Sequence, residues 1–197
     1  MLFNALNAEA LQKVKQTGLP YFLVSEKEQL GTTFAERYTN ALESIFAQDF
    51  DNVISIGNDT PQLRSQDILD ASQAIKETKA VLGPSKDGGF YLLGIHKTFF
   101  NRNLFLQFPW QKAQLLNSIL RAFDLKNVDT LKLQILQDID TLEDIQVLKD
   151  TFYLSKNIRS ILWQIVSLKT ATISLEISYV PTLFFSQFYN KGSPLTA

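Results

Sequence analysis

Short apolar runs alternate with amphipathic segments along most of this chain. The runs predict strands over 19–25, 52–56, 80–83, 90–95 and 131–137. Apolar residues spaced three and four apart predict helices over 7–16, from Thr33, from Ser65, over 115–123 and from Thr141 to about Asp150. Strands that alternate with helices of about 10–15 residues are typical of βαβ units and a largely parallel sheet.

Polar loops follow several of the predicted strands. "GNDTP" (57–61) follows the apolar run 52–56, "DGG" (87–89) separates two strands, and "QDIDTLED" (137–144) follows the run 131–137. In parallel α/β sheets, ligands bind beyond the carboxyl ends of the strands. Carboxylate oxygens in such a position suit Mg²⁺ or Mn²⁺. Two acidic loops after two strands of one sheet are therefore expected to meet at one divalent cation.

Each of these loops also has a purely structural interpretation. The first is typical of an Asx turn that leads into a helix. A D-G pair between two strands is a common hairpin turn. Thr141 and Asp144 have the spacing of a helix capping box. Asp138 is explained least well in this way, because it precedes the cap.

Composition limits the chemistry and the partners. The 197 residues fit one domain, 45% are hydrophobic, and the net charge is −1, which gives no general attraction to nucleic acid. The chain has no Cys and one His, so it offers no disulfide, no Cys-ligated zinc and little material for a nucleophilic triad. No apolar run approaches the roughly 20 residues of a membrane helix, and the start lacks the core of a signal peptide. We expect a soluble, cytoplasmic protein without a membrane partner.

Four segments, in their order and spacing, resemble the motifs of a known family. They are "GNDTP" (57–61), "GPSKDGGFYLLGI" (83–95), "FPW" (108–110) and "DIDTLED" (138–144). The series resembles uncharacterised bacterial glycosyltransferase-like proteins, which are relatives of 2-phospholactate guanylyltransferase and of the molybdenum-cofactor nucleotidyltransferases. The resemblance covers about residues 19–148. It implies a three-layer α/β/α, Rossmann-like GT-A fold, that of nucleotide-diphospho-sugar transferases, with a mostly parallel sheet.

The resemblance also implies roles for individual residues. Asp59 would hold a Mg²⁺ or Mn²⁺ ion that bridges nucleotide phosphates, and Asp138 and Asp140 would be further metal contacts. The hairpin loop would face the sugar or the acceptor, which makes Asp87 the candidate catalytic residue. The candidate substrate-binding residues are Gly88, Gly89, Trp110 and Arg37. Ala35 departs from the family pattern, because a glycine is common there.

A larger departure concerns the start of the chain. The family normally opens with a strand and a basic, glycine-rich loop that wraps the nucleotide, and no segment here matches it. We therefore expect the sheet to lack its first strand. Two functions stay open. One is a metal-dependent glycosyltransferase or nucleotidyltransferase with a nucleotide-activated donor, and the other is a degenerate, non-catalytic binding or interaction protein of the same fold.

The tail lies outside the resemblance. We divide the chain into a transferase-like domain over 1–150 and an extension over 151–197 that packs on the same domain. A helical stripe follows "NIRSILWQIVSLK" (157–169), and alternation over 172–179 predicts a strand that shields the open side of the sheet. Its apolar surface leaves a homodimer as an alternative.

Overall fold

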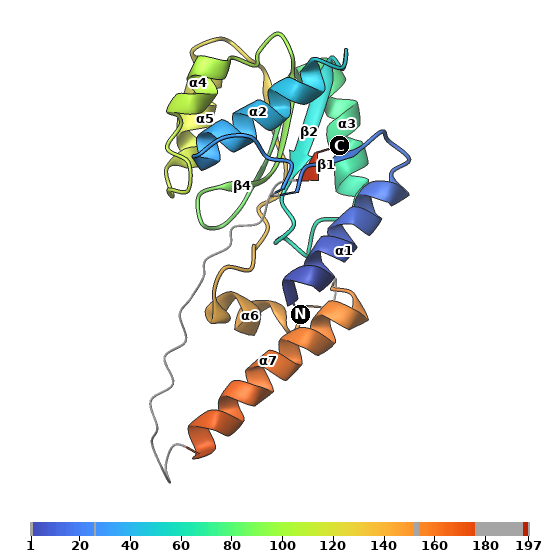
Figure 1. Cartoon of the computed structure of the whole chain (residues 1–197), viewed down its shortest axis with the longest axis vertical. Coiled ribbons are helices and arrows are strands. Elements are labelled where there is room, and N and C mark those ends of the chain that lie inside the picture. The colour runs from blue at the N-terminus through green and yellow to red at the C-terminus, as the bar shows by residue number, and fades with distance from the viewer. Residues whose placement is uncertain (1, 26, 152–153, 176–194, 197) are drawn as a thin grey trace.

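A computed structural model describes residues 2–25, 27–151, 154–175 and 195–196 (Figure 1). Its centre is a six-stranded sheet in the order β1–β6–β2–β4–β3–β5. The strands are β1 (Phe22–Leu23), β2 (Asn52–Ile56), β3 (Ala80–Pro84), β4 (Phe90–His96), β5 (Thr130–Lys132) and β6 (Leu195–Thr196). The helices are α1 (Leu2–Gln16), α2 (Phe34–Phe46), α3 (Ser65–Thr78), α4 (Arg102–Gln107), α5 (Leu115–Asp124), α6 (Leu142–Leu148) and α7 (Lys156–Leu175).

The sheet is mixed and mostly antiparallel, so the predicted mostly parallel sheet is wrong. Only β3 and β5 are parallel neighbours among the described strands, and β4 runs antiparallel to both β2 and β3. The cause is the short loop 85–89, because a parallel connection needs a crossover of a dozen residues or so. The chain folds back after β3, and β4 enters between β3 and β2. β2 and β3 still point the same way, since both oppose β4.

Helices cover both faces of the sheet, which gives three layers (Figure 1). Successive side chains of a strand point to opposite faces. Val53 accordingly packs in the cluster that contains α2, α4 and α5, and Ile54 packs in the cluster that contains α1 and α3. Residues of β2 and β3 are buried on both faces, which explains why their sequences read as continuous apolar runs.

Local capping signals agree closely with the helix starts. Thr33, the predicted start of α2, caps this helix in a capping box with Glu36, and Thr141 caps α6 in the same way with Asp144, as predicted. α3 begins at Ser65, as predicted, and its N-cap is Arg64. The carboxylate of Asp67 accepts from the Arg64 backbone N–H at 2.9 Å, so the acidic residue satisfies this end of the helix.

The tail departs from its predicted secondary structure. Residues 172–175 belong to α7, so the strand predicted over 172–179 is wrong there, and 176–179 lie outside the described residues. A helix satisfies its own backbone groups, whereas a strand needs a partner, and the apolar stripe of 158–165 already favours helix. β6 pairs with both β1 and β2, so residues 195–196 take the place beside β2 that we expected 172–179 to cover.

A third apolar cluster joins α1, α6 and α7 beyond one end of the sheet (Figure 1). Leu6, Ile145, Ile158 and Leu162 are buried in it. The proposed division of the chain near residue 150 remains a prediction. No helix in the part of the chain that the structure describes has the length and hydrophobicity to cross a bilayer.

Candidate functional site

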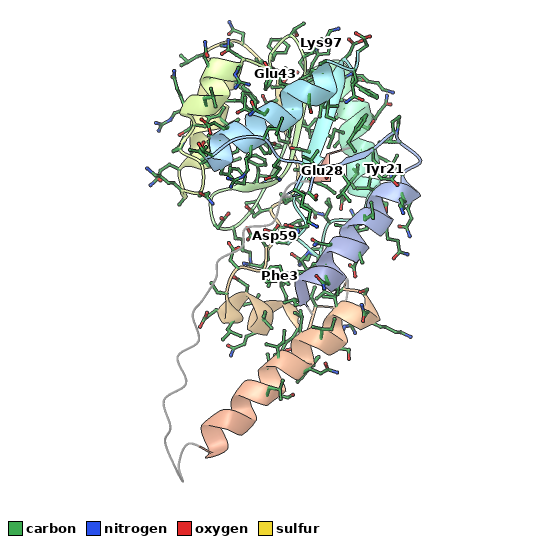
Figure 2. The ribbon with its side chains drawn as sticks, in the orientation of Figure 1. Phe3, Tyr21, Glu28, Glu43, Asp59 and Lys97 are labelled. Carbon is green, nitrogen blue, oxygen red and sulfur yellow. The ribbon has the colours of Figure 1, made fainter. Side chains whose placement is uncertain are left out.

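The three polar loops singled out in the sequence meet at one end of the sheet. Asp59 follows β2, Asp87 follows β3, and Asp138 follows a short parallel bridge between Ser85 and Leu136; all three acids line one cleft of about 100 Å³. β2, β3 and β5 run in the same direction, which brings the loops after them together. Figure 2 shows Asp59 at the end of the sheet that faces α1 and α6, opposite Lys97.

Backbone hydrogen bonds tie these loops to one another. The Ile139 N–H donates to the Asp59 carbonyl at 2.9 Å, and the Lys86 N–H donates to the Leu136 carbonyl at 3.2 Å. The side chain of Lys13, on α1, donates to the Pro61 carbonyl at 2.8 Å. The acidic side chains are therefore carried by loops that are fixed to each other and to α1.

Asp138 is the buried centre of the acidic group. Its side chain is only 8% exposed, and carboxylate oxygens of Asp87, Asp138 and Asp140 lie within 4.8 Å of one another. Burial, the largest cause, and the negative charges of Asp87, Asp59 and Asp140 together raise the pKa of Asp138 to about 7. No basic side chain forms an ion pair with Asp138 among the residues described.

Asp59 lies near this trio but outside it. It lines the same cleft, is half-buried, and contributes its charge to the raised pKa of Asp138. Of the predicted metal-binding residues, Asp138 and Asp140 thus come together with Asp87, the residue to which we gave a catalytic role. Metal binding by any of them remains a prediction.

The hairpin loop accounts for Asp87, Gly88 and Gly89. The Asp87 carboxylate accepts from the Gly89 N–H at 2.8 Å and from the Ser85 hydroxyl at 2.7 Å. Gly88 has a φ of 89°, and a Cβ there would lie 2.1 Å from the Ala113 carbonyl oxygen. The D-G pair is therefore a tight hairpin turn, as its structural interpretation held, and Asp87 also lines the cleft.

The neighbouring acid Asp144 has a different use. It accepts from the Thr141 backbone and hydroxyl at 2.7 and 2.8 Å, and from the Gln137 amide at 2.7 Å. These contacts confirm the capping interpretation for Thr141 and Asp144. They leave Asp138 and Asp140 as the acids of this loop that belong to the cluster around Asp87.

An aromatic wall forms another part of the lining. We use this name for Phe34, Tyr38, Phe90 and Trp110. The Trp110 ring centroid is 4.7 Å from that of Tyr38 and 5.4 Å from that of Phe34, and its indole N–H donates to the Phe105 carbonyl at 2.7 Å. The buried Tyr38 hydroxyl pairs with the Ser55 hydroxyl, and burial raises the pKa of Tyr38. Tyr38 therefore stays protonated at neutral pH.

The predicted substrate-binding residues are divided by the structure. Gly89 and Trp110 line the cleft, Gly88 supports the hairpin, and Arg37 is outside the lining, where its guanidinium donates to the Thr32 carbonyl at 3.3 Å. Phe34, Phe90 and Lys112 also line the cleft, and none of them was predicted as a site residue. Phe34 and Phe90 belong to elements whose apolar pattern already had an explanation. The sequence held one indication for Lys112, since it lies two residues after Trp110, a predicted site residue.

Comparison with known proteins agrees with the family resemblance. The chain belongs to a family described as uncharacterised protein conserved in bacteria (DUF2064), whose model matches residues 5–112. The fold matches the crystal structure of a candidate nucleotide-diphospho-sugar transferase from Desulfovibrio desulfuricans G20, with a TM-score of 0.72 and 24% identity. The match covers 88% of this chain and 84% of the other. No curated protein matches. At this identity the likeness establishes the α/β fold of that class, and not an activity.

Proposed function

We propose that this protein is a metal-dependent transferase that uses a nucleotide-activated donor and moves either a glycosyl or a nucleotidyl group. The observation that carries the proposal is the buried Asp138, which shares a cleft with Asp59 and Asp87 and has no basic partner among the described residues. Burying one carboxylate beside other negative charges is unfavourable unless a cation is bound or a proton is taken up. The fold likeness to a candidate nucleotide-diphospho-sugar transferase supports the same class.

The donor atoms suit a hard divalent cation. Asp87, Asp138 and Asp140 would hold Mg²⁺ or Mn²⁺, because these ions prefer carboxylate and water oxygens, and Asp59 lines the same cleft. When bound, the ion would neutralise charge that develops on the leaving phosphates. Trp110 and Gly89 would contact the transferred group or the acceptor, and Asp87 would face the reacting atoms from the hairpin loop.

A non-catalytic binding protein is the second candidate. It is favoured by the exposure of Asp87 and Asp140, because exposed acidic groups are common without a bound ion. The two candidates differ in what they require. An enzyme must bind a donor with the help of the metal and turn it over, whereas a degenerate relative need do neither.

Calorimetry with UDP-, GDP-, CDP- and ADP-linked sugars tests the proposal. Mn²⁺ should strengthen binding of at least one of these donors by about tenfold or more, since each tenfold change is only about 1.4 kcal/mol. Asp59→Asn should remove that gain. Asp51→Asn is the matched control, because Asp51 is an exposed acid that immediately precedes β2, at the strand's other end, and pairs with Lys97. If no donor binds with or without metal, the transferase proposal fails and the non-catalytic candidate takes its place.

A further inference from the structure

We propose that Lys112 binds a phosphate group of the ligand and so makes the cleft selective for phosphorylated ligands; this inference rests on the proposed function. Asp59, Asp87 and Asp138 line the cleft, and Lys112 is the one basic residue among the described residues that line it. The lysine is exposed, so its ammonium group is accessible from solvent.

The charges of the site create a need for such a cation. The carboxylates of Asp87, Asp138 and Asp140 bring three negative charges, and a divalent cation brings two positive ones. With the metal bound, the site therefore keeps a net negative charge of one. Asp59 adds to it. A phosphate ester carries one or two negative charges, and it would be repelled by this site unless a further positive charge is nearby. Lys112 supplies that charge, and a lysine is a common point-charge partner of phosphate.

The backbone on which Lys112 stands is fixed firmly against the hairpin loop. Trp110, two residues earlier, is buried and held through its indole N–H. The Leu116 N–H donates to the Gly88 carbonyl at 3.0 Å, and the Lys112 N–H donates to the Pro109 carbonyl at 3.2 Å. Gln111 has a φ of 60°, which turns the chain between Trp110 and Lys112. The base of the lysine is thus held next to the loop of Asp87, while its long side chain is free to follow a ligand.

A nearby lysine provides a matched control. Lys86 is also exposed and directly precedes Asp87, yet it does not line the cleft. If phosphate binding depended only on the general charge near the hairpin, loss of either lysine would have the same effect. If it depends on a direct contact inside the cleft, only Lys112 should matter.

Calorimetry on the full chain measures the binding of Mn²⁺ alone, and then the binding of inorganic pyrophosphate in saturating Mn²⁺. The experiment compares the wild type with Lys112→Gln, Lys112→Arg and Lys86→Gln, each of which is first checked for an unchanged thermal unfolding midpoint. Lys112→Gln should weaken pyrophosphate binding by about tenfold, as expected for a lost charge-assisted hydrogen bond, and leave Mn²⁺ binding within about twofold. Lys112→Arg should restore most of the affinity, and Lys86→Gln should change it less than about twofold.

The outcomes separate this inference from the proposed function. If the wild type binds Mn²⁺ and pyrophosphate but Lys112→Gln binds both equally well, or if Lys86→Gln loses as much affinity, the role of Lys112 is refuted and the metal site stands. A wild type that binds Mn²⁺ without binding pyrophosphate also refutes it. If the wild type binds neither, the proposed function and this inference fail together.

Discussion

The aromatic wall and the acidic group line the same cleft, but they have opposite effects on the stability of the folded protein. The rings of the wall pack on one another, and the Trp110 N–H and the Tyr38 hydroxyl both have hydrogen-bond partners. The wall is thus part of the core that folding favours. Asp138 is buried among carboxylates, and no base pairs with it in the described residues. Its burial is unfavourable for the protein alone.

This difference shows which part of the cleft needs an explanation outside folding. Apolar packing at Trp110 is expected in any stable domain, so its presence in the cleft says little about function. A buried carboxyl group whose pKa is raised by burial and by neighbouring acids, such as Asp138, is typical of functional sites. Removal of a side chain should therefore lower stability in the aromatic wall and raise it at Asp138.

The largest effect is expected in the wall. Trp110→Ala should lower the free energy of unfolding by about 3–5 kcal/mol, because it removes a large buried ring and leaves a cavity. The chain's other tryptophan is the control. Trp163 is 45% exposed and lies under the Lys149 ammonium, so Trp163→Ala should cost about 1 kcal/mol or less. Urea denaturation measures both. Equal losses would contradict the placement of Trp110 in the core.

The next effect concerns the hairpin loop that joins the two regions. Gly88→Ala should destabilise the protein by about 2–4 kcal/mol, since it combines a positive φ with a Cβ that clashes with the Ala113 carbonyl. Gly18 has a φ of 69° but open space around its Cβ position. Gly18→Ala should therefore cost only about 1 kcal/mol. Similar losses for the two variants would show that the loop is not pressed against the backbone of Ala113.

A smaller effect is expected from Asp138, and it depends on pH. The unfolded chain releases this proton near about pH 4, whereas the folded protein holds it to about pH 7. Between these values the folded state binds more protons, so this group makes the metal-free protein less stable as the pH rises, and its effect is constant above them. Glu36, whose pKa is lowered to about 2, acts in the opposite direction but only at lower pH.

Asp138→Asn separates these contributions. Measured with a chelator present, the advantage of the variant over the wild type in unfolding free energy should be about 1–3 kcal/mol larger at about pH 8 than at about pH 4. Asp51→Asn, which removes an exposed acid with a lowered pKa, should show no such gain at high pH. A constant difference between Asp138→Asn and the wild type across this range would mean that Asp138 is not protonated in the folded protein near neutral pH.

Sequence patterns predicted the local features of the fold well and its strand pairing poorly. The capping boxes at Thr33 and Thr141 depend on residues three apart, so they can be read directly. The position of β4 between β2 and β3 depends on a hairpin whose D-G pair had two interpretations, and on partners far away in the chain. The alternation over 172–175 was overridden by continuation of α7.

The candidate site was predicted in part, for similar reasons. Asp138 was noticed because it precedes the helix cap and had no local use. Its grouping with Asp87 was not predicted, because the mutual distance of two loops depends on the antiparallel insertion of β4. Of the wall, Trp110 was predicted, whereas Phe34 and Tyr38 were not, because the apolar stripe of a helix already explained them.

Direct titration of Mn²⁺ into the chelator-free protein at about pH 8 tests the central claim, that the acidic group is a metal site. We expect one bound Mn²⁺ per chain in the wild type. The affinity for Mn²⁺ should be at least about tenfold weaker in Asp138→Asn and unchanged in Asp51→Asn. The metal should also remove the stability advantage of Asp138→Asn over the wild type. If the wild type binds no Mn²⁺, or if Asp138→Asn binds it as tightly as the wild type, the acidic group is not a metal site.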